Sequence, residues 1–129
     1  MAAWGVIVGV PLVAAGIAAS QAGWGPGIEL LATWVLMLAG WGVAWMHFRL
    51  VVRDTTVNGA VRILWTIAAC SLFTGMLLAG IYGSRSLGLA APWLDIPWMR
   101  ALHGTMNSLG FALFGLLGWC RAGRACGCC

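Results

Sequence analysis

Long apolar runs, separated by short stretches rich in polar residues, glycine or proline, make up most of the chain. The runs cover residues 4–20, 28–52, 61–82 and 100–120, and apolar side chains fall on all sides of each expected helix instead of on one stripe. A helix of about 20 such residues crosses a bilayer. The pattern therefore predicts an all-α fold, an integral membrane four-helix bundle that forms one domain over residues 1–129, with a short cysteine-rich tail over residues 121–129.

The composition also indicates that lipid, and not water, surrounds the chain. Only 8% of the 129 residues are charged and 62% are hydrophobic, whereas about a quarter of the residues in a soluble domain are charged. The basic residues are arginines at the ends of apolar runs, so we expect lipid and other integral membrane proteins as partners, and no nucleic acid. The first run lacks the positively charged region of a signal peptide, which favours a retained helix; a cleaved signal peptide is the alternative.

The arginines also predict the orientation. Five fall on one side of the expected bundle and two on the other: Arg49, Arg53, Arg62, Arg121 and Arg124 against Arg85 and Arg100. Because cytoplasmic loops are enriched in basic residues, we expect both termini in the cytoplasm (N-in/C-in) and the protein in the bacterial inner membrane. Tryptophans form the expected interfacial belts: Trp4, Trp65 and Trp119 on the inner side, Trp24, Trp93 and Trp98 on the outer side.

Small residues four apart predict where the helices pack, since helices in lipid associate through close contact and a few polar bonds. Three such seams are expected: Gly5 with Gly9, Gly40 with Ala44, and Gly104 with Ser108 and Ala112.

A stripe of aromatic residues marks the second run. Trp34, Trp41, Trp45 and Phe48 recur at spacings of seven, four and three residues, and His47 lies beside them. These side chains are candidates for contact with a partner protein or with a partner's pigment, haem or quinone. Lipid-facing or core aromatics are the alternative.

A cluster of polar residues opens the fourth run. Arg100, His103 and Asn107 follow one another at helical spacing, and Asp95 is close enough in sequence to pair with Arg100 or His103. Polar groups at membrane depth are costly and usually face the bundle interior or a water-filled cavity. The cluster therefore predicts either a polar, proton-responsive pocket or a hydrogen-bonded clamp that fixes the preceding loop.

Imidazoles raise the question of haem. With both helices running inward, His47 and His103 are expected to differ in depth by roughly 24 Å, too far for one haem to be ligated by both. Each could ligate a separate cofactor with a partner's help, but a packed or interfacial histidine is the simpler expectation.

Four of the five cysteines lie in the last ten residues of the sequence. Cys120, Cys126, Cys128 and Cys129 could hold a soft metal through thiolates, but they lack the paired spacing of structural zinc sites. Lipidation and unmodified thiols are the alternatives.

Catalytic motifs are absent from the sequence: it contains no Walker loop, nucleophile elbow, dinucleotide fingerprint or HExxH. With three acidic residues in the chain, paired-carboxylate catalysis is also disfavoured. We expect a protein that is not an enzyme and has no certain cofactor of its own.

The last third of the chain resembles a known family. The runs 94–99 (LDIPWM), 103–111 (HGTMNSLGF) and 115–119 (GLLGW) are similar to the final transmembrane region of YndJ-like membrane proteins. On this resemblance His103, Gly104, Asn107, Gly110 and Phe111 are the family-type positions. The resemblance implies a membrane fold, and because such proteins are often labelled transporters it also raises a transporter-like role with a polar site at His103 and Asn107.

The function expected from the residues is a binding role. The small-residue seams, the aromatic stripe and the lack of catalytic groups favour a non-catalytic accessory subunit that packs against larger membrane proteins, with respiratory or photosynthetic electron-transfer complexes as natural hosts. The transporter-like protein and a soft-metal-binding membrane protein are the alternatives.

Overall fold

The computed structural model describes residues 2–24, 27–53, 57–87 and 95–125, which are almost entirely helical and contain no strand. Its elements in chain order are α1 (Ala2–Gln21), α2 (Gly27–Arg53), α3 (Gly59–Gly83), the 3₁₀ turn η1 (Ser84–Leu87), α4 (Ile96–Thr105), the π-helical segment η2 (Met106–Leu113) and α5 (Phe114–Ala125). The last three follow one another without a break and are called here the C-terminal helix. The predicted all-α fold with four helices is confirmed.

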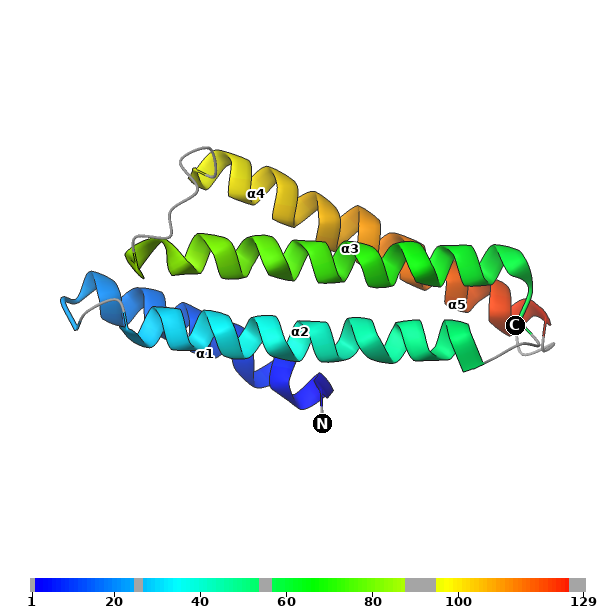
Figure 1. Ribbon diagram of the computed structural model, residues 1–129, viewed down its shortest axis with the longest axis horizontal. Coiled ribbons are helices and arrows are strands. Elements are labelled where there is room, and N and C mark those ends of the chain that lie inside the picture. Colours follow the sequence, from blue (N-terminus) through cyan, green and yellow to red (C-terminus); the bar gives the residue numbers. More distant parts are fainter. Residues whose placement is uncertain (1, 25–26, 54–56, 88–94, 126–129) are drawn as a thin grey trace.

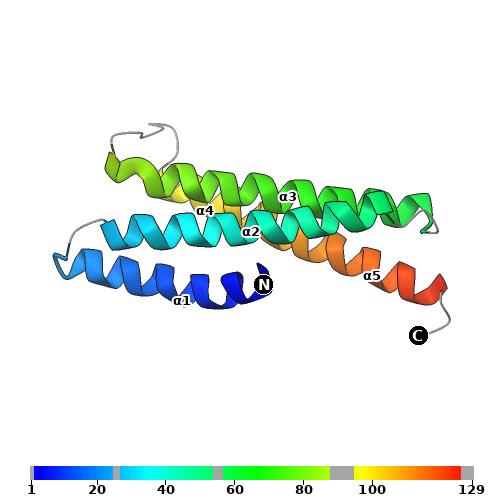
Figure 2. The ribbon, with the colours of Figure 1, turned by 60° about the horizontal axis from the view of Figure 1, so that its bottom comes forward.

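The helices are arranged around a central antiparallel pair. Figure 1 shows α2 and α3 side by side along the long axis, with α1 against α2 and the C-terminal helix running obliquely across α3. Figure 2 shows α1 on the outer side of α2. The end of α2, the start of α3 and the end of α5 meet in one apolar cluster formed by Val51, Val61, Trp65, Val57 and Ala122. Arg53, Arg62 and Arg121 therefore lie at the same end of the molecule.

The central pair has the dimensions of membrane-spanning helices. Both α2, with 27 residues, and α3, with 25, are about 40 Å long, which exceeds the roughly 30 Å of a hydrocarbon core. Within their most apolar stretches only 22% and 39% of the residues are buried, whereas the core helix of a soluble protein is mostly buried. Length, composition and exposure together indicate a membrane protein.

Close helix contacts depend on glycine, as expected for helices that associate without a hydrophobic driving force. The predicted seam at Gly40 and Ala44 is confirmed: both residues are buried, and a Cβ added at Gly40 would lie 2.6 Å from Met76 Cγ on α3. The α1–α2 contact is less adjustable, because a Cβ added at Gly16 would lie 2.9 Å from the Cα atom of Glu29, which is backbone and not a flexible side chain. The surroundings of Gly5 and Gly9 lie outside what the structure describes, so the seam predicted there stays a prediction.

The seam predicted on the C-terminal helix is wrong. A Cβ at Gly104 would meet nothing within 4 Å, and Ser108 and Ala112 are exposed. The contact with α3 is made instead by Gly110, against the side chain of Ser71, and by Gly118, against Trp65. The face that packs on α3 carries His103 and Gly110 and lies one position away from the predicted one, so the four-residue spacing of small residues selected the wrong side of the helix.

Two further expectations are corrected. The C-terminal helix begins at Ile96 instead of Arg100 because Asp95 caps it, and it continues to Ala125 through the start of the expected tail. Trp65 is covered by the protein, not by lipid: it is 4% exposed and packs on Trp119, with ring centroids 4.9 Å apart. Trp24 and Trp98 are exposed at the opposite end. Trp93 lies outside the described residues, as do the side chains of Trp4 and Arg124.

Candidate functional site

A short hydrogen-bonded chain joins the C-terminal helix to α3. His103 Nδ1 lies 2.8 Å from the carbonyl oxygen of Gly75, and the Asn107 side-chain amide nitrogen lies 2.9 Å from His103 Nε2. Because a carbonyl oxygen can only accept, Nδ1 carries the proton and donates to Gly75. The Nε2 atom of the neutral ring then accepts from Asn107, so both ring nitrogens are satisfied within the protein.

Glycine at position 75 makes this contact possible. A Cβ there would lie 3.0 Å from Asn107 Oδ1 and 3.3 Å from Met106 Cβ, so even alanine would require these side chains to shift by a few tenths of an ångström. The close approach has a cost, because Asn107 Oδ1 is buried and has no hydrogen-bond partner. A buried unpaired acceptor costs about 1–3 kcal/mol.

The network opens on a cavity of about 500 Å³, called here the His103 cavity. Its lining comes from α1, α2, α3 and the C-terminal helix: Ile7, Val10, Leu36, Gly40, Val43, Leu72, Met76, His103, Asn107 and Phe111. His103, Asn107 and Phe111 are spaced four residues apart across the junction of α4 and η2, where π-type turns begin. π-helical turns within α-helices are rare and are frequent at functional sites.

Only half of the predicted polar cluster comes together. His103 and Asn107 are hydrogen-bonded, whereas Arg100 is exposed and Asp95 Oδ1 accepts from the backbone N–H of Trp98 at 3.0 Å. Asp95 forms no ion pair with Arg100 or His103 in the structure. Its place in the sequence, directly before Ile96 and Pro97, is that of an N-cap residue, which explains why its carboxylate serves the helix terminus.

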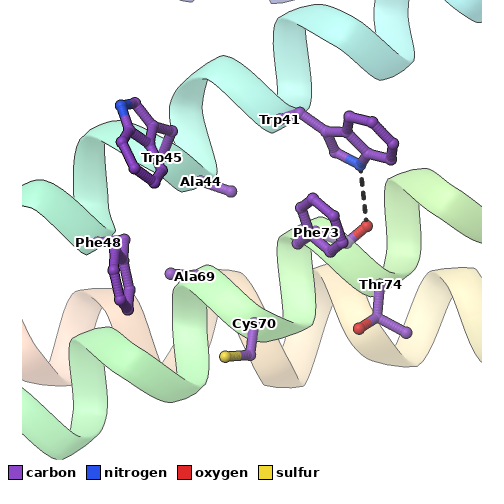
Figure 3. Close-up of a pocket in the computed structure, with 8 residues that line it drawn as sticks. All are labelled: Trp41, Ala44, Trp45, Phe48, Ala69, Cys70, Phe73 and Thr74. Carbon is purple, nitrogen blue, oxygen red and sulfur yellow. Dashed lines mark hydrogen bonds between the residues drawn. The ribbon is translucent and has the colours of Figure 1, made fainter.

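A second feature lies on the other side of the α2–α3 pair. Eight residues form an open groove of about 290 Å³, called here the aromatic groove: Trp41, Ala44, Trp45, Phe48, Ala69, Cys70, Phe73 and Thr74. Figure 3 shows four of these side chains on α2 (Trp41, Ala44, Trp45 and Phe48) and the other four on α3. The Trp41 ring stacks on Phe73 with centroids 4.6 Å apart, and its indole N–H donates to the Phe73 carbonyl oxygen at 3.2 Å.

The predicted aromatic stripe is therefore divided among three places. Trp41, Trp45 and Phe48 share the groove, whereas Trp34 lies with Trp41 beside a separate pocket of about 230 Å³. His47 faces the C-terminal helix: its ring meets the Phe111 ring edge-on at 5.5 Å, and its Nδ1–H donates to the Val43 carbonyl oxygen at 3.1 Å.

The contact between His47 and Phe111 corrects the expected depth of the two histidines. Phe111 is eight residues beyond His103 on the same helix, so the imidazoles are separated by roughly 12 Å along it instead of 24 Å. The difference arises because α4 begins further along the molecule than α2 does (Figure 1). A gap of this size still exceeds what two axial ligands of one haem allow.

An ion pair joins the start of α2 to η1. Arg85 lies 3.0 Å from the Glu29 carboxylate, and its guanidinium also covers the Tyr82 ring at 4.2 Å from the centroid. Thr33, one turn after Glu29, is buried against Gly83. These contacts fix the start of α2 to the end of α3, at the end of the molecule opposite Arg53 and Arg62.

The cysteines give no metal site within the described residues, where no three His, Cys, Asp or Glu side chains come together. Cys70 and Cys120 are exposed free thiols. Cys126, Cys128 and Cys129 lie outside the described residues, so the predicted thiolate cluster stays a prediction.

Sequence reasoning missed the α3 side of both features. Gly75 supplies the carbonyl acceptor, Ser71 the contact for Gly110, and Phe73 the wall of the groove. Ser71 and Gly75 are small residues four apart on one helix, the same signal that identified Gly40 and Ala44.

Comparison with known proteins gives one result. No curated protein and no solved structure matches the chain. The family model described as YndJ-like protein matches residues 1–111, which include α1, α2, α3 and the C-terminal helix as far as Phe111. The match covers the 94–99 and 103–111 runs and stops short of the 115–119 run. Since it extends over most of the 129 residues, the chain belongs to the YndJ-like family.

Proposed function

We propose that the protein is a non-catalytic accessory subunit of a larger integral membrane complex, and that the aromatic groove is where it docks. The observation that carries this proposal is the groove itself: Trp45 is 60% exposed, Phe73 45% and Phe48 42%. Large aromatic side chains are enriched in protein interfaces and supply much of their energy. No residue of the groove is charged.

The groove is also prepared for a rigid partner. Its lining includes three small side chains, Ala44, Ala69 and Cys70, so a neighbouring helix can approach closely. Stacking and the indole hydrogen bond hold Trp41 in place before any partner arrives. A preorganised surface loses less conformational entropy on association than a mobile one.

The membrane orientation belongs to the same proposal. Arg53, Arg62 and Arg121 lie at one end of the molecule and Arg85 at the other, which supports a cytoplasmic location for the first end, with both termini on that side of a bacterial inner membrane. Respiratory or photosynthetic electron-transfer assemblies are the proposed hosts, because the planar pigments, haems or quinones they hold would suit aromatic walls.

Size separation of the full chain, extracted from the membrane in which it is made, tests docking. In mild detergent the protein should co-migrate with a larger complex. Trp45→Ala with Phe48→Ala should release it, whereas Leu109→Ala with Leu116→Ala, which truncates two equally exposed side chains on the C-terminal helix, should not. Migration of the unaltered chain only as a monomer or homo-oligomer would contradict the proposal. An absorption spectrum of the purified complex then reports any haem or pigment.

Side-specific labelling tests the orientation. In a chain whose own cysteines are replaced by serine, cysteines at positions 53 and 121 should react from the cytoplasmic side of sealed vesicles, and a cysteine at Gln21 from the other side. Labelling of positions 53 and 121 from opposite sides would rule out the proposed topology.

A further inference from the structure

The His103 cavity is apolar on every wall but one. Aliphatic side chains and Phe111 form most of its lining, and the polar groups are confined to His103 and Asn107 on the C-terminal helix. None of the ten described residues that line it carries a fixed charge. At about 500 Å³ it falls within the range of small-molecule sites, which is roughly 300–1,000 Å³. An occupant must therefore be mainly apolar and carry no net charge at its polar end, because a buried unpaired charge is costly.

The polar wall offers a defined hydrogen-bond donor. His103 has no free ring nitrogen, since Nδ1–H donates to Gly75 and Nε2 accepts from Asn107. Asn107 Oδ1 is buried away from the cavity against α3. The amide nitrogen of Asn107 carries two hydrogens and uses one on His103. What remains for a ligand is the second N–H, which requires an acceptor oxygen.

The donor is held in place by the fold. His103 is fixed by a bond to the α3 backbone, and Asn107 is fixed by His103, so neither side chain needs to be ordered when a ligand binds. The cavity is open on the side of α1, where Ile7 is 61% and Val10 57% exposed. Apolar residues at this opening suit entry from the hydrocarbon phase instead of from water.

We propose that the His103 cavity binds a neutral lipophilic molecule whose carbonyl oxygen accepts a hydrogen bond from the Asn107 side-chain amide. The head of a membrane quinone and the ester of a glycerolipid both carry this group. The site lies across the α2–α3 pair from the aromatic groove, so it is independent of the docking proposed above and stands if docking fails.

Binding is measured with the full chain in alkyl maltoside micelles, which contain no carbonyl group. Three probes are titrated: a decyl-substituted benzoquinone, dihexanoylglycerol, and dodecane as the apolar control. At least one carbonyl probe should saturate the protein and shift the side-chain amide resonances of Asn107. Asn107→Leu should weaken that probe by about five- to tenfold, equivalent to about 1–1.4 kcal/mol, and Ser108→Ala should not change its affinity.

A second variant guards against a folding defect. Val43→Phe narrows the cavity and leaves the hydrogen bonds of His103 and Asn107 in place, and it should lower the affinity for every probe that enters. Binding of the quinone alone or of the diester alone identifies the source of the carbonyl. Dodecane binding as tightly as the carbonyl probes, an unshifted Asn107 amide at saturation, or full affinity in Asn107→Leu would each overturn the proposal.

Discussion

Adding a methyl group to the C-terminal helix where it meets α3, and removing a side chain of similar size from α3, should reveal which face of the C-terminal helix packs. In Gly110→Ala the new Cβ would overlap the Ser71 side chain, whose Oγ and Cβ are its two nearest neighbours, while the Ser71 Cα stays at an ordinary 3.8 Å. The conflict is thus entirely with the serine side chain. Overpacking of this kind costs about 1–3 kcal/mol.

The structure also predicts the rescue. Removing the serine side chain in Ser71→Gly leaves no atom closer than 3.8 Å to the new Cβ, so Gly110→Ala should then lose its penalty. Alanine is favoured over glycine in a helix by about 1 kcal/mol, so in the Ser71→Gly background the substitution at 110 should be neutral or stabilising. The coupling between the two sites should therefore amount to about 1–3 kcal/mol.

The free energy of unfolding of the four proteins of this cycle, measured by reversible denaturation in mixed micelles, gives the coupling directly. Gly104→Ala is the matched control on the same helix, because its added Cβ meets nothing within 4 Å. It should stabilise the protein by up to about 1 kcal/mol. If Gly104→Ala destabilises as much as Gly110→Ala, or if Ser71→Gly brings no relief, the packing face described above is wrong.

Three other substitutions test separate contacts. Gly16→Leu should separate α1 from α2 more than Gly16→Ala does, because the obstacle is the backbone of Glu29 and no side-chain truncation can relieve it; crosslinking between introduced cysteines on α1 and α2 measures the loss. Arg85→Ala should lower the free energy of unfolding by at most about 1 kcal/mol, since its ion pair is partly exposed, and a larger loss in a denaturation curve would contradict this. Trp65→Phe should destabilise the protein by less than the 3–5 kcal/mol or so typical of losing a core aromatic ring, because it also removes a buried indole N–H that has no partner; the same denaturation assay checks it.

The helices could be predicted from the sequence because one physical signal, the apolar run of membrane length, specifies them. The expected bounds of the second run, 28–52, differ from those of α2 by one residue at each end. The start of the C-terminal helix was missed by four residues. There the local chemistry of Asp95 and Pro97 extends the helix beyond the apolar run, and hydropathy does not report caps.

The candidate site was predicted only in part, since spacing along a helix groups residues on one face but does not say which face meets a neighbouring helix. His103 and Asn107 were grouped correctly because the interval between them begins in regular α-helix. The small residues at 104, 108 and 112 were misassigned because they lie one position away from the face that packs, and small-residue spacing alone does not say which face meets α3. Their acceptor, the Gly75 carbonyl, could not be found at all from side-chain patterns, since every residue has a carbonyl and only packing decides which one a neighbouring helix reaches.

Gly75 connects the packing of the bundle to the chemistry of its cavity. A carbonyl within a helix already accepts from the backbone four residues on, and a second bond from His103 requires the two helices to approach closely. That approach exists because Gly75 has no side chain, and it leaves Asn107 Oδ1 buried against α3 while its amide nitrogen holds His103. The polar wall of the cavity and the α3 contact therefore form together, and whatever moves the C-terminal helix from α3 also removes the donor that a ligand would meet.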